Sequence, residues 1–178
     1  MVLFHKSTHI FQNDFATVSL AFFNRYPNPY SKNVLSTDTL AQHIDPQNGK
    51  LYKTRLIKKD GKLPRWIMPF LGKITTTYIL EKSIVDPMKY TMETYMSNID
   101  HLSIMRVEEY TTYKYDNINH NTIVSSEVKF SSTFREGIRN KVESWSRNKF
   151  DESVKKSREG MVFVMKNLQM KSQNMKEA

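Results

Sequence analysis

Alternation of apolar and polar residues between polar turns, over residues 34–132, constrains the fold of this chain more than any other feature. A period of two puts successive side chains on opposite faces of a strand, and short turns between such segments favour antiparallel neighbours. The turns include DPQNGK at 45–50 and DNINHN at 116–121, both rich in residues that suit tight turns. The predicted strands are 4–11, 34–44, 51–59, 74–85, 90–99, 104–115 and 122–132. The pattern therefore predicts a meandering antiparallel sheet.

Side-chain alternation also predicts which residues share a face of each strand. Val124, Val128 and Phe130 share one side of the last strand. Three apolar residues of the strand 74–85 fall together: Tyr78, Leu80 and Ile84. On the strand 51–59, the basic residues Lys53, Arg55 and Lys59 share a face with Ile57.

Two helices are predicted outside the strand-rich part. Asn13 or Asp14 can cap a helix over 15–26, because a side-chain oxygen there accepts hydrogen bonds from the free N–H groups of the first turn. Its apolar face contains Phe15, Val18, Phe22 and Tyr26, and Arg25 borders that face. A second, long helix is predicted to begin near Phe134 and to run past Leu168.

The apolar stripe of the long helix gives way to polar residues. It begins with Ile138, Val142 and Trp145, and helical geometry continues it to Lys149, Ser153 and Lys156. The apolar face meanwhile rotates to Phe150, Val154, Met161, Met165 and Leu168. One interpretation is that the helix changes its packing face and leaves the lysines in water, since long lysine side chains snorkel. The other is that the polar residues line a cavity and meet an anionic head group.

Composition excludes several functions. The net charge is +9, from 27 Lys and Arg against 18 Asp and Glu, which favours nucleic acid, anionic lipid or an acidic protein as partner over a neutral one. A basic surface that serves only solubility is the simpler alternative. No apolar run approaches the roughly 18 residues of a membrane span. The absence of cysteine excludes disulfides, cysteine-type zinc sites and thiol catalysis.

No catalytic motif stands out in the chain. It contains no HExxH, GxSxG, GxGxxG or P-loop sequence, so we expect no metal site, no cofactor and no enzymatic activity. The nearest acid–base candidates are Asp100-His101 and Glu108-Glu109, which we interpret as polar residues of turns and strands.

Residues 50–73 combine positive charge with an apolar loop. Eight Lys or Arg residues stand there against a single acid, Asp60. Pro64 and Pro69 exclude a regular strand and disfavour a long helix in the loop. The loop is either a short segment that plugs the core, or a mobile lid that covers an apolar cavity or dips into a bilayer interface. The predicted lid residues are Leu63, Pro64, Trp66, Ile67, Met68, Phe70 and Leu71.

A partner for this segment should be both anionic and apolar, as a phospholipid is. The neighbouring Lys59, Lys62 and Arg65 would each attract an anionic lipid surface by about 1 kcal/mol. Basic residues interleaved with aromatic ones also bind single-stranded nucleic acid, but no RNP-type motif, zinc finger or GxxG loop is present.

Six long blocks along the chain resemble the PRELI-like family of mitochondrial lipid carriers. They are HKSTHIF (5–11), AFFNRYPNPYS (21–31), TRLIKKDGKLP (54–64), DHLSIMRVEEYTTY (100–113), VKFSS (128–132) and KVESWSRNKFDESVKKSREGM (141–161). The resemblance implies an α+β fold like that of START and phosphatidylinositol-transfer proteins. That fold is a curved seven-stranded antiparallel sheet, with a long C-terminal helix and an omega-type lid loop enclosing a lipid cavity. It implies one domain over 1–170, followed by a frayed tail over 171–178.

The resemblance also implies a function. It is non-enzymatic transfer of phosphatidic acid between the outer and inner mitochondrial membranes, across the intermembrane space, in support of cardiolipin synthesis. The implied partners are an anionic membrane surface, bound peripherally at the inner membrane, and a small twin-Cx9C protein that forms a heterodimer; nucleic acid is not among them. The alternatives are a phosphatidylserine carrier of the same family, or a basic nucleic-acid- or protein-binding module without a lipid cavity.

The family resemblance assigns seven positions to the lipid head group. They are Arg25, Arg55, Lys59, Lys62, Lys149, Ser153 and Lys156. An arginine can grip two phosphate oxygens at once, whereas lysines act as point charges. This assignment predicts that Arg25→Glu or Lys156→Glu abolishes transfer and leaves the fold intact.

Overall fold

A seven-stranded antiparallel sheet forms the centre of the computed structural model, which describes residues 1–61, 65–71, 76–134 and 136–177. The strand order is β1-β7-β6-β5-β4-β3-β2, so β1 and β2 are the two edges. The strands are β1 (Val2–Phe11), β2 (Val34–Ile44), β3 (Leu51–Asp60), β4 (Thr76–Asp86), β5 (Thr91–Asn98), β6 (Met105–Asp116) and β7 (Asn121–Ser132). All seven strands overlap their predicted ranges, and residues 74 and 75 of the predicted strand 74–85 lie outside the described residues.

Four helical segments accompany the sheet: α1 (Phe15–Phe23), α2 (Met68–Leu71), the 3-10 helix η1 (Glu136–Ile138) and α3 (Arg139–Glu177). Asp14 caps α1 as predicted, because its Oδ1 accepts a hydrogen bond from the Thr17 N–H at 2.8 Å. The predicted extension of α1 to Tyr26 is wrong, since the helix ends at Phe23. A residue before proline, here Tyr26, disfavours helical backbone.

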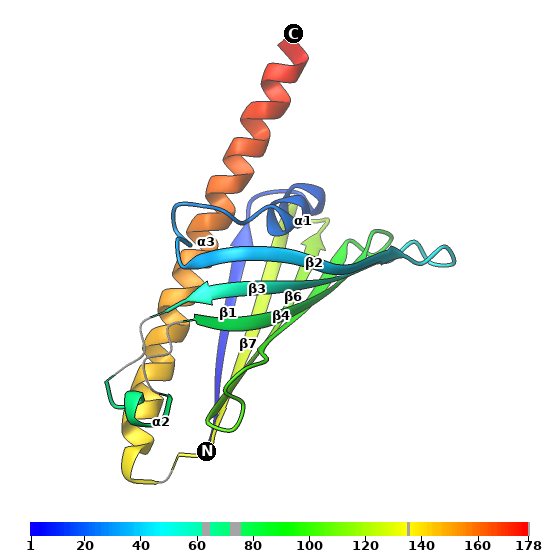
Figure 1. The fold of residues 1–178 in the computed structure, drawn as a ribbon. Helices are drawn as coiled ribbons and strands as arrows, with labels where there is room; N and C mark the ends of the chain where they lie inside the picture. The colour runs from blue at the N-terminus through cyan, green and yellow to red at the C-terminus, as the bar shows by residue number, and fades with distance from the viewer. Residues whose placement is uncertain (62–64, 72–75, 135, 178) are drawn as a thin grey trace.

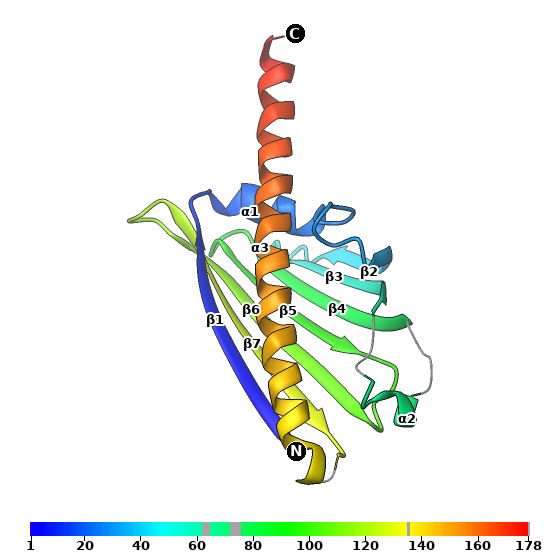
Figure 2. The ribbon, with the colours of Figure 1, turned by 90° about the vertical axis from the view of Figure 1, so that its left-hand side faces the viewer.

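The long helix α3 crosses the open, concave side of the curved sheet (Figure 1). Seen from the side, its C-terminal part extends beyond the strands (Figure 2). The helix continues through residues 171–177, for which the sequence predicts a frayed tail. The domain limits themselves stay a prediction. Among the described residues, no helix has the length and apolar character needed to cross a membrane.

Two apolar clusters join α3 to the sheet. The first unites α1, the sheet and the middle of α3; it contains Phe11, Phe15, Val18, Ala21, Phe22, Met92, Tyr113, Val124, Met161, Val164 and Met165. The second lies at the start of α3 and contains Ile67, Met105, Val128, Phe130, Val142 and Phe150. Burial of a large apolar side chain stabilises a fold by roughly 1.5–3 kcal/mol, so the clusters fix the helix at two places.

The residues predicted to share a strand face do so, but one apolar face lies on the exposed side of the sheet. The face of Val124, Val128 and Phe130 is buried as expected. Tyr78, Leu80 and Ile84 do share a face, but that face is the outer, convex one, where Tyr78 is 38% and Ile84 37% exposed. The polar residues between them, Glu81 and Ser83, therefore point to the concave side and are buried.

Candidate ligand-binding cavity

Two adjoining cavities, of about 310 and 320 Å³, lie beneath α3. They share the lining residues Lys59, Met96, Val107, Glu109, Trp145, Lys149 and Ser153, so they are parts of one cleft. Both volumes fall within the range of small-molecule sites in proteins. The sequence-based interpretation that the polar residues of α3 line a cavity agrees with this geometry for Lys149, Ser153 and Lys156.

Strand register places a row of hydroxyl groups across the concave face. Directly opposite residues share a face with their Cβ atoms about 5 Å apart. The paired residues that form the row, one from each of five neighbouring strands, are Ser7, Ser126, Thr111, Thr94 and Ser83. The hydroxyls of Thr111 and Ser126 lie 2.8 Å apart, and both line the first cavity. The floor of the cleft is thus polar along this row.

A second row, two residues further along each strand, carries the charges. It consists of His5, Val128, Glu109, Met96, Glu81 and Arg55. Glu109 and Glu81 lie on this row with Met96 between them, and Arg55 stands opposite Glu81 at the β3 end.

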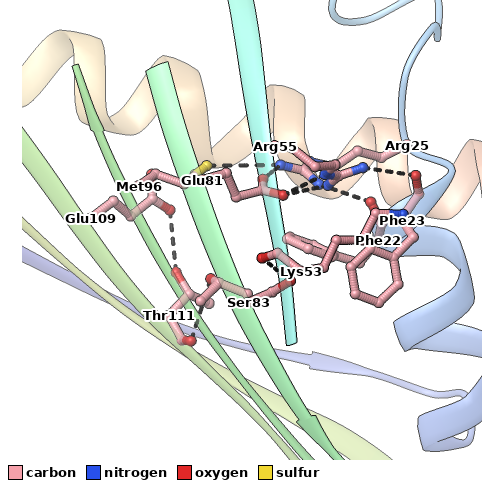
Figure 3. A network of polar contacts seen from close by, with 11 residues as sticks. Phe22, Phe23, Arg25, Lys53, Arg55, Glu81, Ser83, Met96, Glu109 and Thr111 are labelled. Carbon is pink, nitrogen blue, oxygen red and sulfur yellow. Dashed lines mark hydrogen bonds and ion pairs between the residues drawn. The ribbon is translucent and has the colours of Figure 1, made fainter. Parts of the chain in front are cut away.

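Arg25, Glu81 and Arg55 form a buried ionic triad at this end of the cleft (Figure 3). Their side chains are 6%, 1% and 4% exposed. Glu81 accepts a short hydrogen bond from Arg25 Nη2, and its Oε1 accepts one from Arg55 Nε at 2.7 Å. Burial alone would raise the pKa of the Glu81 carboxyl, but the two guanidinium groups outweigh it and lower that pKa. Glu81 is therefore ionised and balances one of the two positive charges.

The triad also holds the end of α1 against the sheet. Arg25 Nη1 donates to the Phe22 carbonyl at 2.8 Å, and Arg55 Nη1 donates to the Phe23 carbonyl at 2.9 Å. Free carbonyls at a helix C-terminus favour nearby cations, which explains why two arginines gather there. The Arg25 guanidinium also lies 3.9 Å from the centre of the Phe22 ring.

Two of the predicted head-group residues, Arg25 and Arg55, are already ion-paired within the triad. Arg25 lines the first cavity but is ion-paired, and Arg55 is paired behind it without lining either cavity. Arg25→Glu would bring a second carboxyl against Glu81 in a buried site. The expectation that this substitution leaves the fold intact therefore conflicts with the geometry, whereas Lys156 lies on an exposed helix face.

Three lysines and Arg158 supply the accessible positive charge of the cleft. Lys59, near the end of β3, lines both cavities, and within the described ranges it has no ion-pair partner. Lys149 and Lys156 flank Glu152 on α3, at 3.2 and 2.7 Å between Nζ and the carboxylate. Exposed pairs of this kind contribute about 0–1 kcal/mol, so an anionic ligand can replace them at little cost. The predicted Lys62 lies outside the described residues.

Trp66 and Ile67, from the predicted lid loop, pack in the second apolar cluster. Ile67 is 1% exposed and belongs to the second apolar cluster, and it lines the second cavity. The Trp66 ring lies edge-on to Phe134 at 5.6 Å between ring centres. Met68 is 38% exposed, and Phe70 and Leu71 lie in the short helix α2. Leu63 and Pro64 lie outside the described residues, and the role of the loop as a lid stays a prediction.

The sequence interpretation missed the two acids of the cleft. Glu81 was obscured because its strand carries its large apolar residues on the convex face. Glu109 was interpreted as an ordinary strand residue, although alternation from the buried Met105 and Tyr113 puts it on the concave face. Burial raises the pKa of the Glu109 carboxyl, and this effect exceeds the opposing one of Lys59.

The architecture defines a class: a curved antiparallel sheet closed by a long helix over a ligand cavity, as in START-like folds. TTHA0849 from Thermus thermophilus matches it with a TM-score of 0.62 and 12% identity, over 93% of this chain and 99% of that one. Ara h 8.0201 matches with a TM-score of 0.55 and 15% identity, over the same shares of each chain. At these identities the similarity concerns the fold alone.

Sequence similarity identifies the family. The model of the PRELI-like family matches residues 16–171, and the chain belongs to that family. The chain is 62% identical to "Protein UPS1, mitochondrial" of Saccharomyces cerevisiae over 169 residues, which cover 95% of this chain and 96% of that protein. It is 41% identical to "Protein ups1 homolog" of Schizosaccharomyces pombe, over 84% and 86% of the two chains. The human "PRELI domain-containing protein 1, mitochondrial" is 34% identical over 95% of this chain and 78% of that protein.

Proposed function

We propose that this protein is a non-enzymatic phospholipid carrier of the mitochondrion with phosphatidic acid as its cargo. It moves the lipid between the outer and inner membranes, across the intermembrane space, and so supports cardiolipin synthesis. Membership of the PRELI-like family and two relatives named as mitochondrial support this proposal.

The observation that carries the proposal is a cleft whose lining combines lysines from β3 and α3 with apolar residues. Lys59 faces the cleft from β3, and Lys149 and Lys156 face it from α3. A phosphomonoester carries a charge of up to about −2, and its burial requires cations and hydrogen-bond donors. The second cavity, with Ile67, Ile79 and Met105 in its lining, provides apolar surface for acyl chains.

Arg25 and Arg55 have a different part in this proposal from the lysines. Because Arg25 and Arg55 are both ion-paired with Glu81, the phosphate contacts come first from Lys59, Lys149 and Lys156, with the hydroxyl of Ser153 as a donor. Arg25 keeps a positive field at the cavity wall, because one carboxylate balances only one of two arginines. Lys62 remains a proposed contact by family resemblance.

The membrane and protein partners follow from the family and the charge. A chain of net charge +9 is attracted to an anionic membrane surface, where it would dock peripherally at the inner membrane. We also propose a heterodimer with a small twin-Cx9C protein, which would keep the carrier soluble between membranes. One domain over residues 1–170 would carry both activities.

Liposome transfer of labelled phosphatidic acid by Lys156→Glu protein tests the proposal. We expect at least a tenfold loss of transfer, since a like charge replaces a contact worth about 1.5–3 kcal/mol. Lys155→Glu makes the same charge change on the neighbouring helix residue, which lines neither of the two cavities, and should transfer normally.

Other outcomes would redirect the assignment. Preferential transfer of phosphatidylserine would favour the other lipid of the family. Purified protein without co-purified phospholipid and without transfer of either lipid would contradict a carrier function and favour a basic nucleic-acid- or protein-binding module. Equal transfer by the Lys155→Glu and Lys156→Glu proteins would remove Lys156 from the site.

A further inference from the structure

Glu109 is an acid inside a cleft proposed to hold an anion. Glu109 and Glu152 are the acids that line the two cavities in the described part of the chain, and Glu152 is bound to Lys149 and Lys156 on the helix surface. Glu109 instead stands on the concave face of the sheet and lines both cavities.

The immediate neighbours of Glu109 hold it in place without neutralising it. The Thr111 hydroxyl lies 3.3 Å from its Oε1, and its register partners on β5 and β7 are the uncharged Met96 and Val128. Within the described residues Glu109 forms no ion pair at 4 Å or less. The Arg25 guanidinium is ion-paired with Glu81, so Lys59 is the cation that lowers the pKa of Glu109 most strongly.

A phosphate held by Lys59 would share this space with the Glu109 carboxyl. Two like charges in a site of low dielectric repel each other strongly, so one of the two groups must bind a proton. A protonated carboxyl, in contrast, donates a hydrogen bond to a phosphate oxygen. Burial already raises the pKa of Glu109, which makes the neutral form accessible.

We propose that Glu109 is a specificity residue that couples loading of an anionic head group to the uptake of one proton. This coupling rests on the proposed function of the protein as a carrier of phosphatidic acid. A proton from solvent binds the Glu109 carboxylate when the phosphate enters, and it returns to solvent when the lipid leaves. The neutral carboxyl donates to the phosphate, whereas the ionised carboxyl repels it.

Other titratable groups also line the cleft and must be separated from Glu109. They are His9, Arg25, Tyr26, Lys59, His101, Tyr113, Lys149, Glu152, Lys156 and Arg158, with Glu81 behind Arg25. The phosphate itself has a second pKa near 6. All of these groups are common to the wild type and to Glu109→Gln, so the difference between the two proteins isolates Glu109.

Linkage gives the sign and the size of the effect. A bound anion raises the pKa of Glu109 further, so the complex binds more protons than the free protein in the window between the two pKa values. In that window the wild-type affinity falls up to tenfold for each unit of pH increase, relative to Glu109→Gln.

Calorimetric titration with a water-soluble, short-chain phosphatidic acid tests the coupling. Wild type, Glu109→Gln and Glu93→Gln are titrated from pH 5 to pH 8, in buffers of different ionisation enthalpy that report proton uptake. Glu93 is an exposed residue of β5 whose side chain points to the convex face, so its variant matches the charge change without touching the cleft. Thermal unfolding confirms that each variant is folded.

We expect wild type and Glu93→Gln to take up about one proton more than Glu109→Gln within the window, and Glu109→Gln to bind more tightly than wild type at pH 8. Equal proton uptake and equal pH dependence in all three proteins would overturn the coupling while leaving the carrier function intact. A loss of binding in Glu109→Gln at every pH would also overturn it, because the neutral side chain should favour the anion. Absence of binding by the wild type would overturn the carrier function itself.

Discussion

Substitution Glu81→Gln removes the negative charge that two buried arginines share. Glu81 is 1% exposed, and Arg25 and Arg55 are 6% and 4% exposed, so water cannot replace the lost charge. Removal of one partner from a buried ion pair typically costs 3–5 kcal/mol, because it leaves an uncompensated charge. The glutamine side chain would keep one acceptor oxygen, so we expect a loss of about 3–4 kcal/mol in the free energy of unfolding. This is a large share of the roughly 5–15 kcal/mol of a typical domain.

Urea denaturation, followed by circular dichroism, measures this loss. With a slope near 2 kcal/mol per molar urea, the midpoint should fall by about 1.5–2 M. Glu127→Gln is the matched control, since Glu127 pairs with Lys6 at the surface with exposures of 39% and 74%. That pair should contribute about 0–1 kcal/mol. Equal midpoints for the two variants would refute the view that the buried triad secures α1 to the sheet.

Two further substitutions test the packing around the cleft. Gly160→Ala should lose about 1 kcal/mol of stability in the same urea assay, because a Cβ there would lie 2.8 Å from Asn28 Nδ2. Asn28 cannot move away easily, since it donates a hydrogen bond to the Arg25 carbonyl and accepts one from the Tyr30 N–H. This overpacking outweighs the helix-propensity gain of about 1 kcal/mol, whereas Gly137→Ala, with no atom within 4 Å of its Cβ, should lose nothing. Replacement of residues 63–71 by a Gly/Ser loop should slow extraction of phosphatidic acid from liposomes if the loop is a lid, and unchanged extraction rates together with a lowered urea midpoint would identify it as a structural plug.

The positions of the strands and helices followed from the sequence because they depend on local patterns. Alternation over 34–132 predicted the strands, and the turn residues placed the connections between them. The lysine and serine residues of α3 could be predicted to share a face because helical spacing is a local property. The end of α1 was missed by one turn, although Tyr26-Pro27 marks it.

The charges of the cleft depended instead on contacts between distant segments. Arg25 and Glu81 are 56 residues apart, and Arg55 and Glu81 are 26 apart, so no spacing in the sequence shows that they neutralise one another. Alternation predicts that Tyr78, Leu80 and Ile84 share a face of their strand, but it does not predict which face of the sheet α3 covers. The register of the sheet decided that Glu81 and Glu109 lie inside.

The sequence by itself determined the architecture, the family and the basic character of this protein, because periodicity, turns and net charge are properties of the chain. Only the tertiary structure decided which cations are available to a ligand. Arg25 and Arg55 are buried and ion-paired with Glu81, whereas Lys59 and the lysines of α3 stay accessible. The physical reason is that the availability of a charge depends on its burial and its counter-ion, and folding sets both.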